Sequence, residues 1–124
     1  MSVRYDVTTG SVRAYGAGIW SVRQAAAYFR EWRDIVRAIH ARGLSLSALI
    51  DMGDGQVQSE EVAEIMANIT ADMYRPGDAI AMRVPSSLAK MQLRRILDAR
   101  YHEFFMSPAA AETWLKGKAI SAAG

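Results

Sequence analysis

The side chains best suited to binding or catalysis lie in one short segment, "LSALIDMGDGQVQSEEV", which covers residues 46 to 62. An apolar run ends there in an acid, a loop with two glycines and a second acid follows, and an amphipathic helix is predicted to begin. Such junctions can hold ligands because helix N-termini present free N–H groups at the carboxyl ends of strands. The candidate contact residues are Asp51, Gly53, Asp54, Gly55, Ser59 and Glu60.

The chemistry of this segment is open to three interpretations. It contains neither the phosphate-binding pattern GxxxxGK[ST] nor the dinucleotide pattern GxGxxG. Asp51 and Asp54 would repel a phosphate, and two carboxylates can hold Mg²⁺ only with further ligands or substrate phosphates. The segment is therefore a solvated turn capped by Ser59, a binding or switch surface, or a catalytic loop.

Nothing elsewhere in the sequence predicts a catalytic or metal centre. His40 and His102 are the only histidines, and neither has a second ligand three or four residues away. No GxSxG nucleophile elbow is present. Two hydroxyls stand in "PSSL", where Ser86 is predicted to cap a helix and Ser87 is the freer of the two. A nucleophile, a base and an orienting group cannot be assembled, so we expect a non-enzymatic protein without cofactor or metal.

The charge pattern argues against nucleic acid as a partner. Fifteen Lys and Arg stand against thirteen Asp and Glu, a net charge of +2 that demands no polyanionic partner. The bases Lys90, Arg94, Arg95 and Arg100 of the third predicted helix could form a patch together with the arginines of the first. Acids are interspersed along both helices. A solvated mixed-charge face is the better interpretation.

Length and composition predict a single globular domain over residues 1–124, with a frayed tail at about 117–124. The absence of cysteine excludes disulfides and thiol catalysis and is compatible with a reducing compartment. The first ten residues carry no apolar signal region, and no apolar run approaches the ~20 residues that span a bilayer. We therefore expect a cytoplasmic protein without membrane insertion.

The order of elements predicts an α/β fold. Alternating apolar and polar residues, capping signals and turn residues indicate the order ββαβαβαβα, which predicts a mostly parallel sheet of about five strands with four helices. The first two strands should form a hairpin around "TTG". The expected strands are 3–7, 11–18, 44–52, 79–85 and 101–106, and the expected helices begin at residues 21, 59, 86 and 107, the second ending near 74 and the third near 100.

The first helix shows the clearest signals. Ser21 and Gln24 fit a capping box, and Gly43 fits a C-terminal cap. Its predicted buried stripe consists of Ala25, Phe29, Trp32, Val36 and Ile39.

The residue before the cap, Trp20, either forms a hydrophobic staple or joins Tyr15 and Ile19 in an interface. Those three side chains, together with an apolar face of the second helix that one small sheet could not cover, predict a homodimer.

The pattern as a whole resembles the STAS domains, the anti-sigma-factor-antagonist or SpoIIAA-like fold, and within them small stand-alone bacterial STAS-like proteins. The resemblance covers nearly the whole chain and rests on fold-level motifs rather than on a chemical signature. The motifs are "GIWSVRQAAAYFREW", "LSALIDMGDGQVQSEEV", "AIAMRVPSSLAKMQLRRI" and "FFMSPAAAETWL".

The resemblance implies a regulatory or scaffolding domain that works through protein–protein contacts at the loop after the third strand and along the second helix. In regulated members of the family, a serine in an Asp-Ser-Ser-Gly run at the start of that helix is phosphorylated. This chain departs there, since "SEEV" places Ser59 near the acid and Glu60 near the phosphorylated serine. A glutamate at a helix N-terminus is permanently charged and favoured by the helix dipole. The loop thus resembles a contact surface held in one charge state.

A second class of function stays open. The strand C-terminal loops and an apolar pocket could instead hold a small apolar ligand or lipid, although the chain is short for enclosing a whole lipid. An apolar pocket larger than ~300 Å³ would favour this ligand-binding alternative. A flat, apolar, two-fold-related patch would favour the interaction protein.

Overall fold

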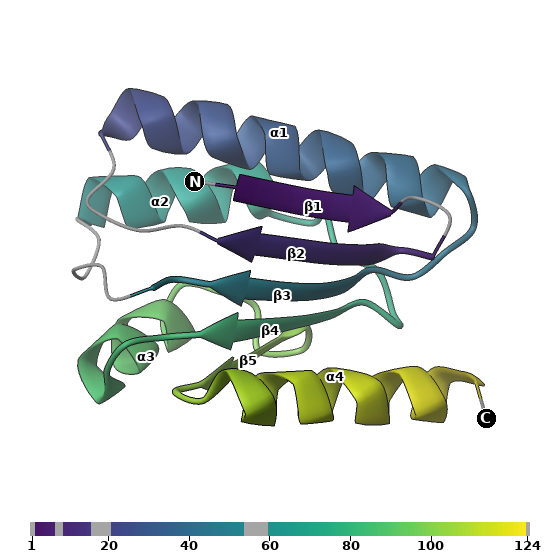
Figure 1. The fold of residues 1–124 in the computed structure, drawn as a ribbon. Helices are drawn as coiled ribbons and strands as arrows, with labels where there is room; N and C mark the ends of the chain where they lie inside the picture. Colours follow the sequence, from purple (N-terminus) through teal and green to yellow (C-terminus); the bar gives the residue numbers. More distant parts are fainter. Residues whose placement is uncertain (1, 7–8, 16–20, 54–59, 124) are drawn as a thin grey trace.

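The computed structural model describes residues 2–6, 9–15, 21–53 and 60–123. Within them the elements follow the predicted order ββαβαβαβα (Figure 1). The strands are β1 (Ser2–Asp6), β2 (Ser11–Tyr15), β3 (Ser47–Asp51), β4 (Ala79–Arg83) and β5 (His102–Phe105), and the helices are α1 (Val22–Ala41), α2 (Glu60–Thr70), α3 (Ser87–Arg94) and α4 (Pro108–Ala123).

The strands form one five-stranded sheet in the order β1-β2-β3-β4-β5. β1 pairs antiparallel with β2, as the predicted hairpin requires, and the other three pairings are parallel. The predicted α/β class, the four helices and the mostly parallel sheet are therefore confirmed for the described residues.

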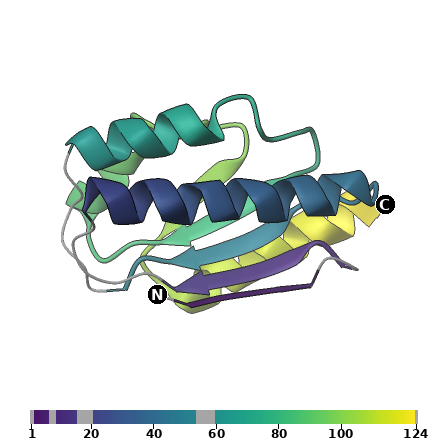
Figure 2. The same ribbon diagram turned by 90° about the horizontal axis from the view of Figure 1, so that it is seen from above.

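The helices lie on both faces of the sheet. α1 and α2 lie side by side on one face, and α4 covers the other (Figures 1 and 2). Each parallel strand is added on the same side of the previous one, so right-handed crossovers place their helices on one face. Residues of α3 join the same hydrophobic cluster as α1 and α2. α4 follows the last strand, is not a crossover, and is free to take the opposite face.

The signals identified in the sequence of α1 are confirmed in detail. Ser21 Oγ accepts a hydrogen bond from Gln24 N at 3.1 Å, and Gln24 Oε1 accepts one from Ser21 N, which completes the capping box. All five residues of the predicted stripe are buried. At the other end Gly43 adopts φ +75° and donates to His40 O at 2.9 Å, the arrangement that glycine favours after a helix.

Several boundaries differ from the prediction. α2 ends at Thr70 instead of residue 74, and Asp72 takes φ +56°, which turns the chain toward β4. α3 ends at Arg94 instead of residue 100. Within the predicted helix, Asp98 Oδ1 accepts from Arg100 N at 2.9 Å and forms a local turn in place of a helical hydrogen bond. β3, β4 and β5 are also shorter than predicted, and residues 16–18 of the second predicted strand lie outside the described residues.

The C-terminal helix is longer than predicted. Ser107 Oγ accepts from Ala110 N at 3.3 Å as an N-cap, as expected. α4 then continues to Ala123 and includes most of the segment 117–124, for which fraying was predicted. Alanine is the best helix former and recurs through this segment, which favours continuation of the helix.

Two clusters of buried side chains hold the layers together. The larger lies between the sheet and α1, α2 and α3, and it includes Trp32, Ile39 and Ile80. The smaller lies under α4, where Ala79, Ala81 and Ala111 allow the helix to approach the sheet closely. The apolar face of α2 belongs to the larger cluster, so the expectation that one sheet could not cover it was wrong for Val62 and Met66.

Candidate functional site

The predicted contact segment begins at an ion pair between neighbouring strands. Asp51 and Arg83 are the last residues of β3 and β4, and the parallel register places them directly opposite each other. Arg83 Nη1 lies 3.4 Å from Asp51 Oδ1 and donates to Gly53 O at 2.8 Å. Gly53 N donates in turn to Asp51 Oδ1 at 2.8 Å. The start of the loop is thus held at the carboxyl edge of the sheet.

A third strand joins this arrangement. Arg83 Nε donates to Met106 O at 3.4 Å, just beyond the end of β5. One guanidinium therefore contacts residues that follow two different strands as well as Asp51. Both contacts of the Asp51 carboxylate, with the guanidinium and with a backbone N–H, use Oδ1 and help to fix the start of the loop.

Sequence reasoning did not select Arg83, although its position offered a signal. It closes the apolar strand "AIAMR", as Asp51 closes "SALID". In a parallel sheet, residues that close adjacent strands lie side by side, so opposite charges at both ends predict a pair.

The remaining candidate residues fall into two groups. Trp20, Asp54, Gly55 and Ser59 lie outside the described residues. Glu60 and Glu61 occupy the first turn of α2, where both are exposed and where the helix dipole favours acids. Ser87 begins α3 and is exposed, while Ser86 caps that helix by accepting from Ala89 N at 3.2 Å.

A surface groove of about 660 Å³ runs between α2 and α3, beside this edge. Four residues of α2 line it at helical spacing, and the facing residues belong to α3 and the turn after it. The groove residues are Glu60, Ala63, Glu64, Ala67, Leu88, Met91, Gln92, Arg95 and Ile96. It joins the predicted contact segment to a partly apolar surface, because Leu88 and Met91 are exposed.

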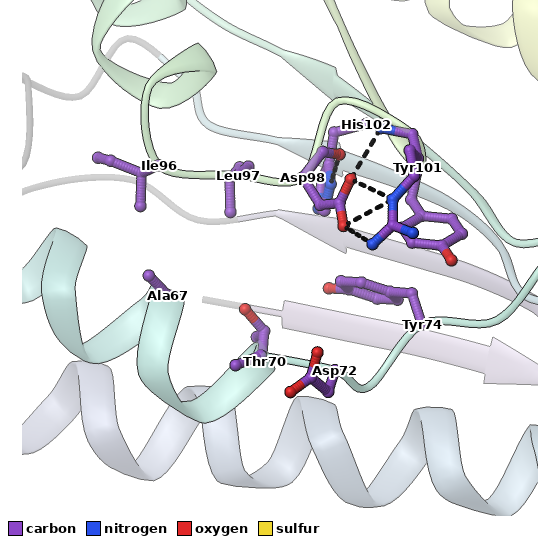
Figure 3. A pocket seen from close by; sticks show the side chains of 11 residues that line it. Ala67, Thr70, Asp72, Tyr74, Ile96, Leu97, Asp98, Tyr101 and His102 are labelled. Carbon is purple, nitrogen blue, oxygen red and sulfur yellow. Dashed lines mark hydrogen bonds and ion pairs between the residues drawn. The ribbon is translucent and has the colours of Figure 1, made fainter.

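A separate polar pocket of about 540 Å³ lies where α2 ends and β5 begins (Figure 3). Asp98 and Arg100 form an ion pair at 2.7 Å on its rim, and this pair lowers the pKa of Asp98 to about 2. His102 Nδ1 donates to Asp98 O at 2.9 Å. Tyr74 packs edge-on against the His102 ring at a centroid distance of 5.1 Å.

The buried groups of this pocket are kept uncharged. Burial lowers the pKa of His102, so its imidazole is neutral near pH 7. Burial also raises the pKa of Tyr74, whose hydroxyl accepts from Trp32 Nε1 at 3.0 Å. These contacts stabilise the junction between α1, the end of α2 and β5, and they place no nucleophile beside a base.

The apolar cavity beneath α1 and α2 is small. The cavity between α1, α2 and the sheet holds about 30 Å³ and is lined by residues that include Phe29, Trp32, Met66 and Met82. Typical small-molecule sites enclose roughly 300 to 1,000 Å³.

Two kinds of site are not found in the part of the chain that the structure describes. No three or more His, Asp or Glu side chains gather closely enough there to hold a metal ion. Within the same residues, no helix combines the length and apolar character that crossing a membrane requires.

Comparison with known proteins identifies no relative: no family model, no curated protein and no solved structure shows significant similarity to this chain.

Proposed function

We propose that this chain is a non-enzymatic regulatory or scaffolding domain of the STAS-like kind, which binds a protein partner at the carboxyl edge of its sheet. The observation that carries the proposal is the contact of Arg83 with Asp51 and Gly53, which holds the start of the segment between β3 and α2. A loop anchored at its base loses less conformational entropy on binding, which favours recognition of a partner.

The proposed contact surface is acidic. Glu60 and Glu61 are exposed in the first turn of α2 and supply acidic groups without any modification. In the proposed function they replace a phosphorylation switch, so the surface stays in one binding state. Asp54, in the sequence between β3 and α2, adds a third acid to this segment.

Partner affinity of charge-reversed variants tests the proposal. Immobilised wild-type protein should capture a partner from extracts of the native host, and Asp54→Lys combined with Glu60→Lys should reduce capture at least ten-fold. Glu31→Lys, a reversal of an exposed acid on α1, should not. Equal capture by all three proteins would overturn the proposal.

The state of Ser59 is tested separately. Ser59→Ala should leave partner capture intact and cost only a capping energy of about 1 kcal/mol. Intact mass of the protein purified from its native host should show no phosphate. Stoichiometric phosphate on Ser59 would mean that the loop is a switch and not a surface of constant charge.

The ligand-binding alternative has weaker support. It needs an apolar cavity that can enclose a small ligand or lipid tail, whereas the interior cavity holds about 30 Å³. The polar pocket of about 540 Å³ lies near the start of β5, away from the strand C-terminal loops that the alternative requires. The groove of about 660 Å³ beside those loops is open at the surface and includes Glu60 and Glu64 in its lining, which does not suit a buried lipid tail.

Homodimer formation is a further proposal. Tyr15 closes β2 with 47% of its surface exposed, and the adjoining Ile19 and Trp20 lie outside the described residues. Sedimentation at tens of micromolar should give about twice the monomer mass, and Tyr15→Gln should lower it. A wild-type monomer at that concentration would contradict the dimer.

A further inference from the structure

We infer that the groove between α2 and α3 binds an amphipathic helix of a protein partner, with apolar side chains in the groove and Lys or Arg facing the acids of α2. This inference rests on the proposed function and specifies the chemistry of the partner. It is carried by three features of the groove: exposed apolar side chains on one wall, small residues on the other, and acids that have no ion-pair partner among the described residues.

The first wall presents apolar side chains to solvent. Leu88 and Met91 are 66% and 57% exposed, and they lie one helical turn apart on the same face of α3. The opposite face of this helix is already buried through Ala89 and Leu93. Adjacent exposed apolar side chains beside a groove are typical of a binding surface, whereas scattered ones are not.

The second wall is built from small residues and acids. Glu60, Ala63, Glu64 and Ala67 follow one another at steps of three, one and three along α2 and share one face. The two alanines reach only a short distance toward α3, so the groove keeps a volume of about 660 Å³. Larger apolar residues at these positions would close the space.

The charges of the groove determine the sign of the partner. Among the described residues, Glu60 and Glu64 have no ion-pair partner, and α2 contains no Lys or Arg between Glu60 and Thr70. Covering these carboxylates with an apolar or acidic surface would be costly, because unpaired charges would lose their solvent. The occupant must therefore place bases beside them. Arg95 lies toward the other end of the groove and favours an acid there.

The shape of the groove favours a helix as the occupant. Both walls are helices that begin at the same edge of the sheet (Figure 1), and they present side chains at intervals of three and four residues. A third helix with apolar residues at i, i+3 or i+4, and i+7 matches that spacing. An extended peptide that binds by strand addition would need a free strand edge. The sheet edges are β1 and β5, and neither supplies a residue to the groove.

Selection of peptides from a random library tests the inference even while the partner is unidentified. A random 16-residue phage library is selected on the immobilised wild-type protein after depletion on Leu88→Gln/Met91→Gln. Both substituted side chains are mainly exposed, so the double variant should retain the wild-type unfolding midpoint. We expect enriched peptides with apolar residues at helical spacing and Lys or Arg beside them.

Affinities of one enriched peptide then assign the contacts. Leu88→Gln/Met91→Gln should weaken binding at least ten-fold, and Glu64→Lys about five-fold. The control Tyr5→Gln, which removes an exposed apolar side chain from β1, should leave affinity unchanged. A peptide with Glu in place of its bases should bind Glu64→Lys better than it binds wild type.

Three outcomes would overturn the inference: no enrichment over the depleted variant, enriched peptides without bases, or a wild-type dimer that Leu88→Gln/Met91→Gln converts to monomer. The last would show that a second copy occupies the groove. Capture of a partner from extracts of the native host distinguishes failure of this inference from failure of the proposed function. Capture lost in Asp54→Lys/Glu60→Lys but kept in Leu88→Gln/Met91→Gln would refute the groove alone, and capture unaffected by either variant would refute both.

Discussion

His40 and Asp78 form a buried pair, with Nε2 of the imidazole 2.8 Å from Oδ2 of the carboxylate. Their side chains are only 5% and 1% exposed. The same carboxylate accepts from Leu46 N and Arg75 N, each at 2.8 Å. One acid thus joins the end of α1, the chain entering β3 and the turn before β4.

Removal of this acid should destabilise the protein strongly. Asp78→Ala would leave an imidazole, the buried N–H of Leu46 and the partly buried N–H of Arg75 without an acceptor. Loss of one partner from a buried pair costs about 3 to 5 kcal/mol. Urea unfolding should show that loss, whereas Asp34→Ala, at an exposed acid on α1, should stay within about 0.5 kcal/mol of wild type. Equal stability of the two variants would mean that the pair contributes little.

A second prediction concerns the core under α1. Trp32 is 3% exposed, so Trp32→Ala should lower the free energy of unfolding by about 3 to 5 kcal/mol. Trp32→Phe should cost less, because it keeps an aromatic ring in the core. Its remaining cost includes the lost hydrogen bond to Tyr74. The exposed neighbour Glu31→Ala is the control. A loss below ~1 kcal/mol for Trp32→Ala would place the side chain outside the core.

Two glycines with the same backbone angle should respond differently to alanine. Gly10 and Gly43 both adopt φ +75°, which costs an L-residue about 1 to 2 kcal/mol. A Cβ at Gly10 would collide with the carbonyl oxygen of Ser45, whereas one at Gly43 would meet nothing within 4 Å. Gly43→Ala should therefore cost only the backbone strain, and Gly10→Ala clearly more in the same urea titration. Equal losses would show that the backbone near Ser45 moves aside easily.

The buried imidazole of His102 should make the fold sensitive to acid. Burial lowers its pKa in the folded protein, so between that pKa and the unfolded value of about 6.5 the unfolded chain binds more protons. Stability should consequently fall as the pH drops below about 6.5. His102→Gln should flatten this slope between about pH 6.5 and 5, above the range in which ordinary carboxyl groups titrate. Unfolding midpoints against pH measure the slopes, and parallel curves would contradict the assignment.

Local patterns in the sequence determined the architecture. The capping box of Ser21 and Gln24, the glycine after α1 and the apolar stripe through Trp32 depend on residues within a few positions, and they were predicted correctly. Alternation of strands and helices likewise predicted a mostly parallel sheet, since short connections and right-handed crossovers leave few other arrangements. The helix ends were predicted less well, because turns such as that of Asp98 and Arg100 compete locally with the helix.

The tertiary structure alone decided which distant residues meet. Asp51 was selected from the sequence as a candidate contact residue, but its partner Arg83 stands 32 positions away and was identified only through the register of β3 and β4. The pairing of His40 with Asp78 and the approach of Leu88 and Met91 to α2 likewise depend on how helices pack across the sheet. Local sequence sets the conformation of each element, whereas side-chain contacts between elements follow from burying apolar surface over the whole chain.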